Sequence, residues 1–136
     1  MITISLCMIV KNETEVLARC LDSVGYGRTF TAKRDSKIAI LPIGYGDGFP
    51  RSLSGKSFVL IRGQRVPIIG RICMDSLAVD VTDMEDISVG DTATLLGKDA
   101  SEELTAPHIA DSLDSISNEL LCRLSTRLPV VVKNTE

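Results

Sequence analysis

The chain has 136 residues, of which 44% are hydrophobic, so it can form one compact domain; with three phenylalanines, two tyrosines and no tryptophan, its core must be mainly aliphatic. A formal charge of −3 and scattered lysines and arginines argue against nucleic-acid binding. The apolar stretch at residues 2–10 is too short to span a membrane and lacks the features of a signal peptide. We therefore expect a cytoplasmic protein, without a membrane segment in this chain.

The cysteine and histidine content predicts no metal site. The four cysteines, Cys7, Cys20, Cys73 and Cys122, form no C-x-x-C pair, and the single His108 is far from all of them in sequence. We expect reduced thiols and a histidine on the surface.

The first 24 residues predict a strand followed by a helix. Residues 2–10 form an apolar run that is typical of a buried strand, and residues 11–24 place apolar side chains at helical spacing. Asn12 can cap this helix, with Glu15 as the partner in a capping box.

From residue 25 onward the sequence is rich in short β-type runs separated by glycine and proline, which is typical of a barrel or sandwich. A hairpin is expected in FVLIRGQRVPIIG, with its turn at Arg62, Gly63 and Gln64. Two short helices are expected at residues 105–113 and 117–124, capped by Thr105 and Ser117. The other expected strands are SKIAIL before Pro42, LAVDV at 77–81, DTATLLG at 91–97 and a closing strand PVVV at 129–132.

Reasoning from residue types alone finds no catalytic motif. The glycine-rich run at residues 44–48 lacks the strand–loop–helix setting and the terminal Lys-Ser/Thr of a phosphate loop, so it predicts a tight turn. The carboxylates at residues 75–91 are spaced as turn-forming, solvated acids. These observations indicate a soluble β-rich domain.

Several longer segments resemble, in the correct order, the C-terminal domain of bacterial alanine racemases. They are GYGRTFTAKRDSKIAILPIGYGDGFPRSLS, RVPIIGRICMDSLAVDVTD, VGDTATLLGKD, LTAPHIAD and ISNELLCRLSTRLP, and they run from about residue 24 to 132. The resemblance implies a mainly β fold, an alanine racemase C-terminal domain-like β-barrel at residues 25–136, with a short strand–helix appendage at residues 1–24.

The resemblance also implies a chemistry based on pyridoxal phosphate (PLP). In that family a lysine on an N-terminal barrel domain forms the Schiff base, and a tyrosine from the partner subunit's C-terminal domain serves the opposite face of a small amino-acid substrate. Racemisation needs both groups because the proton leaves one face and returns on the other. The tyrosine corresponds to Tyr26, so a homo-oligomer is implied; the alternative for Tyr26 is a half-buried strand residue.

Other positions of the family motif would line the substrate site. Tyr45 matches a tyrosine at the substrate access, Met74 and Asp75 match the wall of the active site, and Arg51 and Arg71 match arginines of the access channel. The alternatives are a turn-packing aromatic for Tyr45, a core-filling side chain for Met74 and solvated charges for the two arginines.

One position departs from the alanine-specific pattern. Alanine racemases usually carry Tyr-Glu where this chain has Asn118 and Glu119, and this segment is similar to the serine racemases of vancomycin resistance. An asparagine leaves space for a β-hydroxyl and offers its amide as a hydrogen-bond partner. The alternative is that Asn118 caps a helix.

The beginning of the chain resembles a different family. ISLCMIVKNET, at residues 4–14, is similar to the first strand and helix of family 2 glycosyltransferases, but the chain has no D-x-D motif to hold a metal and a sugar nucleotide. We therefore predict a junction of two unrelated pieces, with no barrel domain in this chain. The leading hypothesis is a racemase module that supplies Tyr26, Tyr45 and Asn118 to a PLP site on another chain, and that alone binds no PLP and is inactive. The alternatives are a non-catalytic β-domain that associates with itself or a partner and, far behind, a glycosyltransferase fragment.

Overall fold

The computed structural model describes residues 2–3, 6–10 and 30–132. The helix expected at residues 11–24 and the candidate Tyr26 lie outside the described residues. The long apolar run expected at residues 2–10 contains two strands, β1 (Ile2–Thr3) and β2 (Leu6–Val10).

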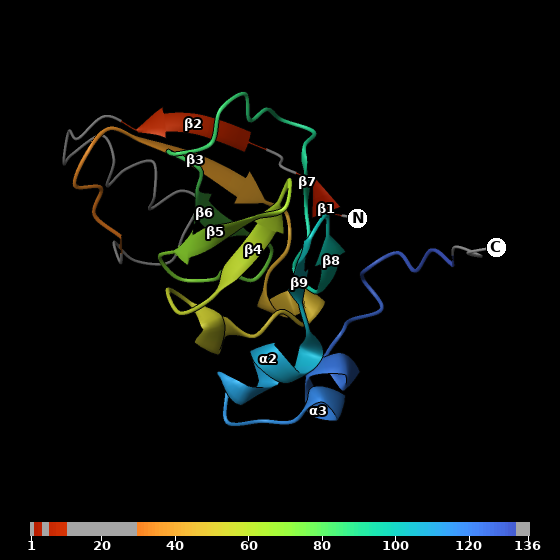
Figure 1. Ribbon diagram of the computed structural model, residues 1–136. Coiled ribbons are helices and arrows are strands. Elements are labelled where there is room, and N and C mark those ends of the chain that lie inside the picture. The colour runs from red at the N-terminus through yellow and green to blue at the C-terminus, as the bar shows by residue number, and fades with distance from the viewer. Residues whose placement is uncertain (1, 4–5, 11–29, 133–136) are drawn as a thin grey trace.

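The centre of the fold is a five-stranded antiparallel sheet with the order β2-β3-β6-β5-β4 (Figure 1). Strand β2 is paired along its whole length with β3, from Leu6 opposite Ile40 to Val10 opposite Ser36. The remaining strands are β3 (Ser36–Leu41), β4 (Phe58–Ile61), β5 (Gln64–Ile69) and β6 (Leu77–Asp80). The mainly β fold predicted from the sequence is confirmed.

Strand β3 is buried on both faces because its apolar residues alternate between two clusters. Ala39 and Leu41 belong to the main core, whereas Ile38 and Ile40 join Ala32 in a smaller cluster on the other face. This explains why the strand is a nearly continuous apolar run rather than an alternation of apolar and polar residues.

The hairpin between β4 and β5 turns where the sequence predicted it. Arg62 and Gly63 both have positive φ, 51° and 71°, as a two-residue type I′ connection requires. The pairing runs from Ile61 opposite Gln64 to Phe58 opposite Pro67.

Two small sheets complete the β structure. Strand β7 (Thr92–Ala93) pairs with β1, so the strand expected at 91–97 is shorter than predicted. Strands β8 (Gly97–Asp99) and β9 (Glu102–Leu104) form a second hairpin, which the sequence did not predict because five of its six residues are glycine or charged.

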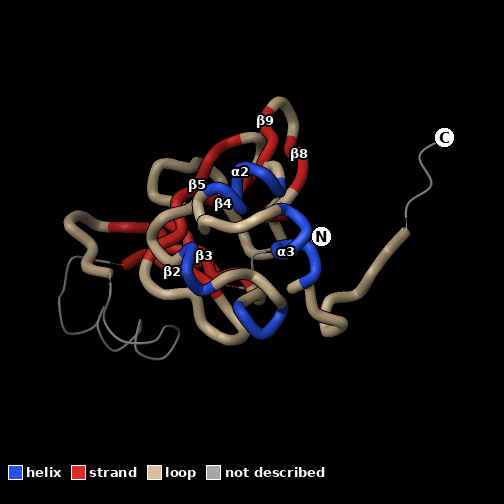
Figure 2. Tube along the Cα trace, turned by 90° about the horizontal axis from the view of Figure 1, so that it is seen from below, coloured by secondary structure: helices blue, strands red, loops and turns tan. Residues whose placement is uncertain are grey.

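The two α-helices that the structure describes contact each other and lie at the end of the molecule away from β2 and β3 (Figure 1), and the view from below shows them next to each other (Figure 2). Two 3-10 helices, Tyr45–Asp47 and Arg51–Leu53, follow β3 in the chain. In α2 (Ala106–Asp111) the Thr105 hydroxyl accepts a hydrogen bond from the His108 amide at 3.3 Å, which confirms the predicted cap. Helix α3 (Ser117–Cys122) starts after Ile116 and has no side-chain cap, so the prediction that Ser117 caps it is wrong. No described helix has the length and hydropathy of a bilayer span.

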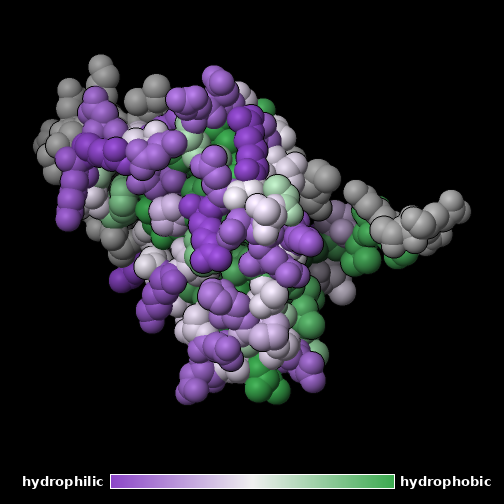
Figure 3. Space-filling model, in the orientation of Figure 1, coloured by the Kyte–Doolittle hydropathy of each residue, from purple (hydrophilic) through white to green (hydrophobic). Residues whose placement is uncertain are grey.

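The closing strand predicted at residues 129–132 is also wrong. Val130, Val131 and Val132 are 87%, 74% and 82% exposed, and this segment projects from the body as an extended tail (Figures 1 and 3). Three consecutive valines favour a strand, but a strand forms only with a partner, and no described strand pairs with these residues.

Candidate functional site

The glycine-rich run at residues 44–48 is a tight turn that leads out of β3, as its sequence predicted. Tyr45–Asp47 form a 3-10 turn, closed by a hydrogen bond of 2.9 Å from the Gly44 amide to the buried Asp47 carboxylate. A Cβ at Gly44 would lie 2.1 Å from the Cys73 carbonyl oxygen, so glycine is needed here for close packing of two backbones.

This turn is fastened to the loop that carries Met74. The Tyr45 amide donates to the Cys73 carbonyl and the Gly46 amide donates to the Met74 carbonyl, each at 2.9 Å. Tyr45 and Met74 are 40% and 45% exposed, so two candidate side chains are exposed on loops that are hydrogen-bonded to each other through their backbones. Met74 is therefore not a core-filling residue, and that alternative is wrong.

A residue that sequence reasoning missed, Arg127, links both loops. Its Nε lies 3.4 Å from Asp47 Oδ1, and its guanidinium also donates to Asp75, another of the candidate residues. The hydrogen bond to Asp75, followed by the charge of Asp47, raises the pKa of Arg127. Arg127 falls within a segment that carries the family resemblance, but no local pattern singles it out, because the Asp75 contact spans 52 positions.

One of the two candidate arginines, Arg51, lines a cavity together with Tyr45. Tyr45, Arg51 and Arg123 line a cavity of 350 Å³ together with Gly48, Phe49 and Pro50. Arg51 is exposed, and its guanidinium is a group that can pair with a small carboxylate, whereas the charge of Arg123 is already paired with Glu119.

Arg123 is held at this cavity by helix α3. Its guanidinium donates to Glu119 at 2.6 Å, and the Ser115 hydroxyl donates to the other oxygen of the same carboxylate. The hydrogen bond from Ser115 and then the one from Arg123 lower the pKa of Glu119.

Not all the candidate residues gather at this cavity. Arg71 and Asn118 are exposed, and neither lines the cavity beside Tyr45. Asn118 is the second residue of α3, whose N-cap position is Ile116, so the alternative that Asn118 caps this helix is wrong. Tyr26, the candidate acid–base group, lies outside the described residues.

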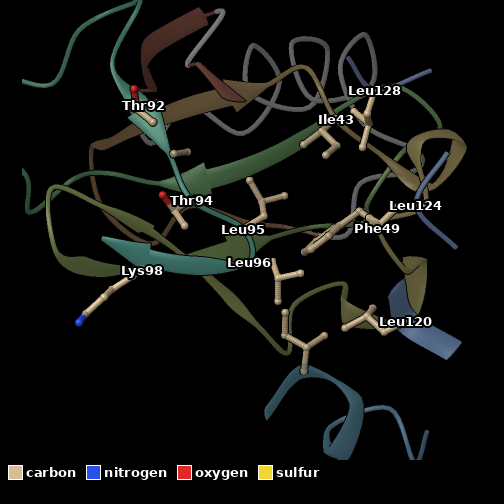
Figure 4. A pocket seen from close by; sticks show the side chains of 13 residues that line it. Ile43, Phe49, Thr92, Thr94, Leu95, Leu96, Lys98, Leu120, Leu124 and Leu128 are labelled. Atoms are coloured by element: carbon tan, nitrogen blue, oxygen red, sulfur yellow. The ribbon is translucent and has the colours of Figure 1, made fainter. Parts of the chain in front are cut away.

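An apolar pocket of 480 Å³ shares Gly48 and Phe49 with the cavity beside Tyr45 (Figure 4). Its wall is mainly leucine, isoleucine and phenylalanine, with Thr92, Thr94 and Lys98 as its polar lining. No carboxylate is among the described residues that line it, and its wall offers mainly apolar contact. The apolar side chains are Ile43, Phe49, Ala93, Leu95, Leu96, Ile109, Leu120, Leu124 and Leu128.

The acidic stretch at residues 75–91 acts mainly in turns and surface ion pairs, as expected from its spacing. Asp91 accepts from the Ser88 amide and from Arg62, each at 2.9 Å, and Asp83 pairs with Arg34 at 2.7 Å. Within the described residues, no group of three or more histidine, cysteine or acidic side chains is arranged to hold a metal ion.

Sequence comparisons relate the chain to racemases. The family model "Alanine racemase, C-terminal domain" matches residues 15–132. An amino-acid racemase of Enterococcus faecalis is 63% identical over 110 residues, which are 80% of this chain and 16% of that protein. An alanine racemase of Halothermothrix orenii is 45% identical over 111 residues, which are 82% of this chain and 29% of that protein. The chain thus spans less than a third of the length of these relatives.

Solved structures give the same relationship. The alanine racemase of E. faecalis superposes with a TM-score of 0.81 at 34% identity, covering 94% of this chain and 32% of that one. The alanine racemase of Bartonella henselae, which carries covalently bound pyridoxal phosphate, gives 0.78 at 31% identity over 92% of this chain and 32% of that one. The family model begins at residue 15, inside the segment expected at residues 1–24, and the domain boundary at 24/25 stays a prediction.

Proposed function

Because this chain belongs to the alanine racemase C-terminal domain family, we propose that it forms the substrate-facing part of an amino-acid racemase. The observation that carries the proposal is the grouping of Tyr45 and Arg51 with Met74 and Asp75, from two segments of the chain, on one exposed side of the domain. Tyr45 and Arg51 would line the access to the reaction centre, and Met74 and Asp75 would form part of its wall.

The described residues fit the open side of such a site rather than the anchor of the cofactor. A Schiff base requires a lysine amine, and none of the described residues that line the cavity beside Tyr45 is a lysine. We therefore place pyridoxal phosphate on a barrel domain, where, when bound, it supplies an electron sink for the α-carbon of the substrate.

Tyr26 would exchange the proton on the face of the substrate opposite the barrel lysine. A phenol has a pKa of about 10 and is a poor base at neutral pH. Its activation must come from the charged and polar groups of a barrel domain, so we propose that the chain alone neither binds pyridoxal phosphate nor racemises amino acids. We also propose that the working form is a homo-oligomer in the cytoplasm.

Asn118 would tune the choice between alanine and serine. Its amide does not cap α3 and lies at the surface, which suits a contact made only when another domain packs there. An amide that hydrogen-bonds the β-hydroxyl of serine would favour serine over alanine.

The test is complementation with an isolated racemase barrel domain loaded with pyridoxal phosphate. Racemisation of alanine and serine should appear on mixing and vanish with Tyr26→Phe, while the matched control Tyr45→Phe should keep measurable turnover with a changed KM. Asn118→Tyr should reduce kcat/KM for serine about 10-fold more than for alanine, or about 1.4 kcal/mol. A folded chain that binds the barrel without restoring any racemisation would contradict the proposal.

A non-catalytic association domain is the second candidate, and exposed apolar surface favours it. Leu96 and Leu124, which line the apolar pocket, are 37% and 47% exposed. The valine tail at residues 130–132 follows Leu124 closely in sequence and is exposed as well. Such surface tends to be covered by a partner. Self-association without restored racemisation would support this function, whereas a monomer at high concentration in light scattering would contradict it.

A further inference from the structure

We propose that Arg127 is a positioning residue: through Asp47 and Asp75 it holds the turn that carries Tyr45 against the loop that carries Met74. The inference rests on the proposed function in one respect only, namely that Tyr45 and Met74 face the substrate. The contact itself belongs to this chain and can be tested without any racemase activity.

The two carboxylates that Arg127 joins differ sharply in burial. Asp47 is 6% exposed, and its Oδ2 already accepts the Gly44 amide, so its Oδ1 faces Arg127 as the counter-charge. Burying a carboxylate without a hydrogen-bonded or charged partner is costly. The side chain of Asp75 is 63% exposed, and an ion pair at that level of exposure contributes little by itself. The contact with Asp47 therefore fixes the turn, and the contact with Asp75 sets the direction of the guanidinium.

The guanidinium also packs directly on the turn. A Cβ at Gly46 would lie 2.3 Å from Arg127 Nη1 and 3.2 Å from Met74 Cγ, so these two side chains meet over Gly46. The Ser125 amide donates to the Asp47 carbonyl at 3.0 Å, which ties the backbone next to Arg127 to the same turn. Arg127 thus sits where the turn, the Met74 loop and the C-terminal segment come together.

The geometry requires arginine rather than lysine. A guanidinium presents donors along several directions of one plane and can reach two carboxylates on different loops, whereas an ammonium group is a single point charge. Arg127→Lys keeps the charge and should hold one carboxylate, leaving the other loop free to shift.

The experiment uses tyrosine and methionine NMR signals of the full chain. The sequence has two tyrosines, so labelled tyrosine in a Tyr26→Phe background reports on Tyr45 alone, and Met74→Leu assigns the methyl signal of Met74 among four methionines. Arg127→Lys should shift or broaden the signals of Tyr45 and Met74. The matched control is Arg65→Lys, which changes an exposed ion pair with Glu102 at 2.7 Å and should leave both signals unchanged.

A folded Arg127→Lys chain with unchanged Tyr45 and Met74 signals would overturn the inference. If that variant does not fold, Asp75→Ala carries the test because it removes only the exposed contact. A shift of the Tyr45 signal, which comes from the other loop, then supports the positioning role, and an unchanged Tyr45 signal overturns it.

Kinetics with a barrel domain separates this inference from the proposed function. In a reconstituted racemase Arg127→Lys should raise KM on the order of 10-fold with a smaller change in kcat, because it disturbs the binding surface rather than the acid–base group. If Arg127→Lys shifts the NMR signals of Tyr45 and Met74 but the chain never restores racemisation, the proposed function is refuted and the positioning role stands. Unchanged signals of Tyr45 and Met74 in an Arg127→Lys chain that still restores racemisation would refute the positioning role and leave the proposed function standing.

Discussion

Gly48→Ala tests how the site turn is locked to helix α3. Gly48 has φ of 101°, and an added Cβ would lie 2.1 Å from the Arg123 carbonyl oxygen and 2.8 Å from the Leu124 Cα. Those atoms belong to the backbone, so a change of side-chain rotamer cannot relieve the clash. The turn and the end of α3 must move apart, which also displaces Arg123 from the cavity beside Tyr45.

The expected loss has two parts. A non-glycine residue in the left-handed region costs about 1–2 kcal/mol, and forcing extra volume into a well-packed place costs about 1–3 kcal/mol more. Gly48→Ala should therefore lower the free energy of unfolding by about 2–5 kcal/mol.

Gly90→Ala is the matched control. Gly90 has nearly the same φ, 99°, but no heavy atom of the described part of the chain lies within 4 Å of its added Cβ, so only the backbone part of the loss remains. Urea unfolding should place the Gly48→Ala midpoint about 1 M below that of Gly90→Ala, given m of about 1–3 kcal/mol per M. Equal midpoints for the two variants would refute the argument that the turn and α3 are in close backbone contact.

Three further substitutions test a core residue, a helix N-cap and one surface carboxylate. Leu53→Ala, at a fully buried position, should lower the free energy of unfolding by about 2–5 kcal/mol in thermal melts, and a loss under about 1 kcal/mol would contradict its burial. Thr105→Ala should cost about 0.5–2 kcal/mol by removing the cap of α2, while Thr105→Ser should retain most of it. The backbone hydrogen bond from Ser88, and then Arg62, lower the pKa of Asp91, so its contribution is complete above the unfolded-state pKa of about 3.9 and is lost as pH falls through the folded value. Asp91→Asn should therefore flatten the acid limb of a plot of stability against pH, and an unchanged acid limb would rule that contribution out.

The sequence by itself determined those elements whose signals lie within a few neighbouring residues. The apolar run of β3, the Arg62 and Gly63 turn of the β4–β5 hairpin, and the Thr105 cap of α2 were all predicted, because dihedral preferences and capping bonds act locally. The order of the longer motifs was enough to identify the racemase family, which the comparisons confirm.

Only the tertiary structure decided which side chains meet. The β8–β9 hairpin forms from polar residues that predict no strand, and the valine tail has strand propensity but no described strand as partner. Arg127 acquires its position from Asp47 and Asp75, which precede it by many residues and lie on two different loops. An ion pair of this kind depends on how the chain folds back on itself, and no local periodicity encodes that.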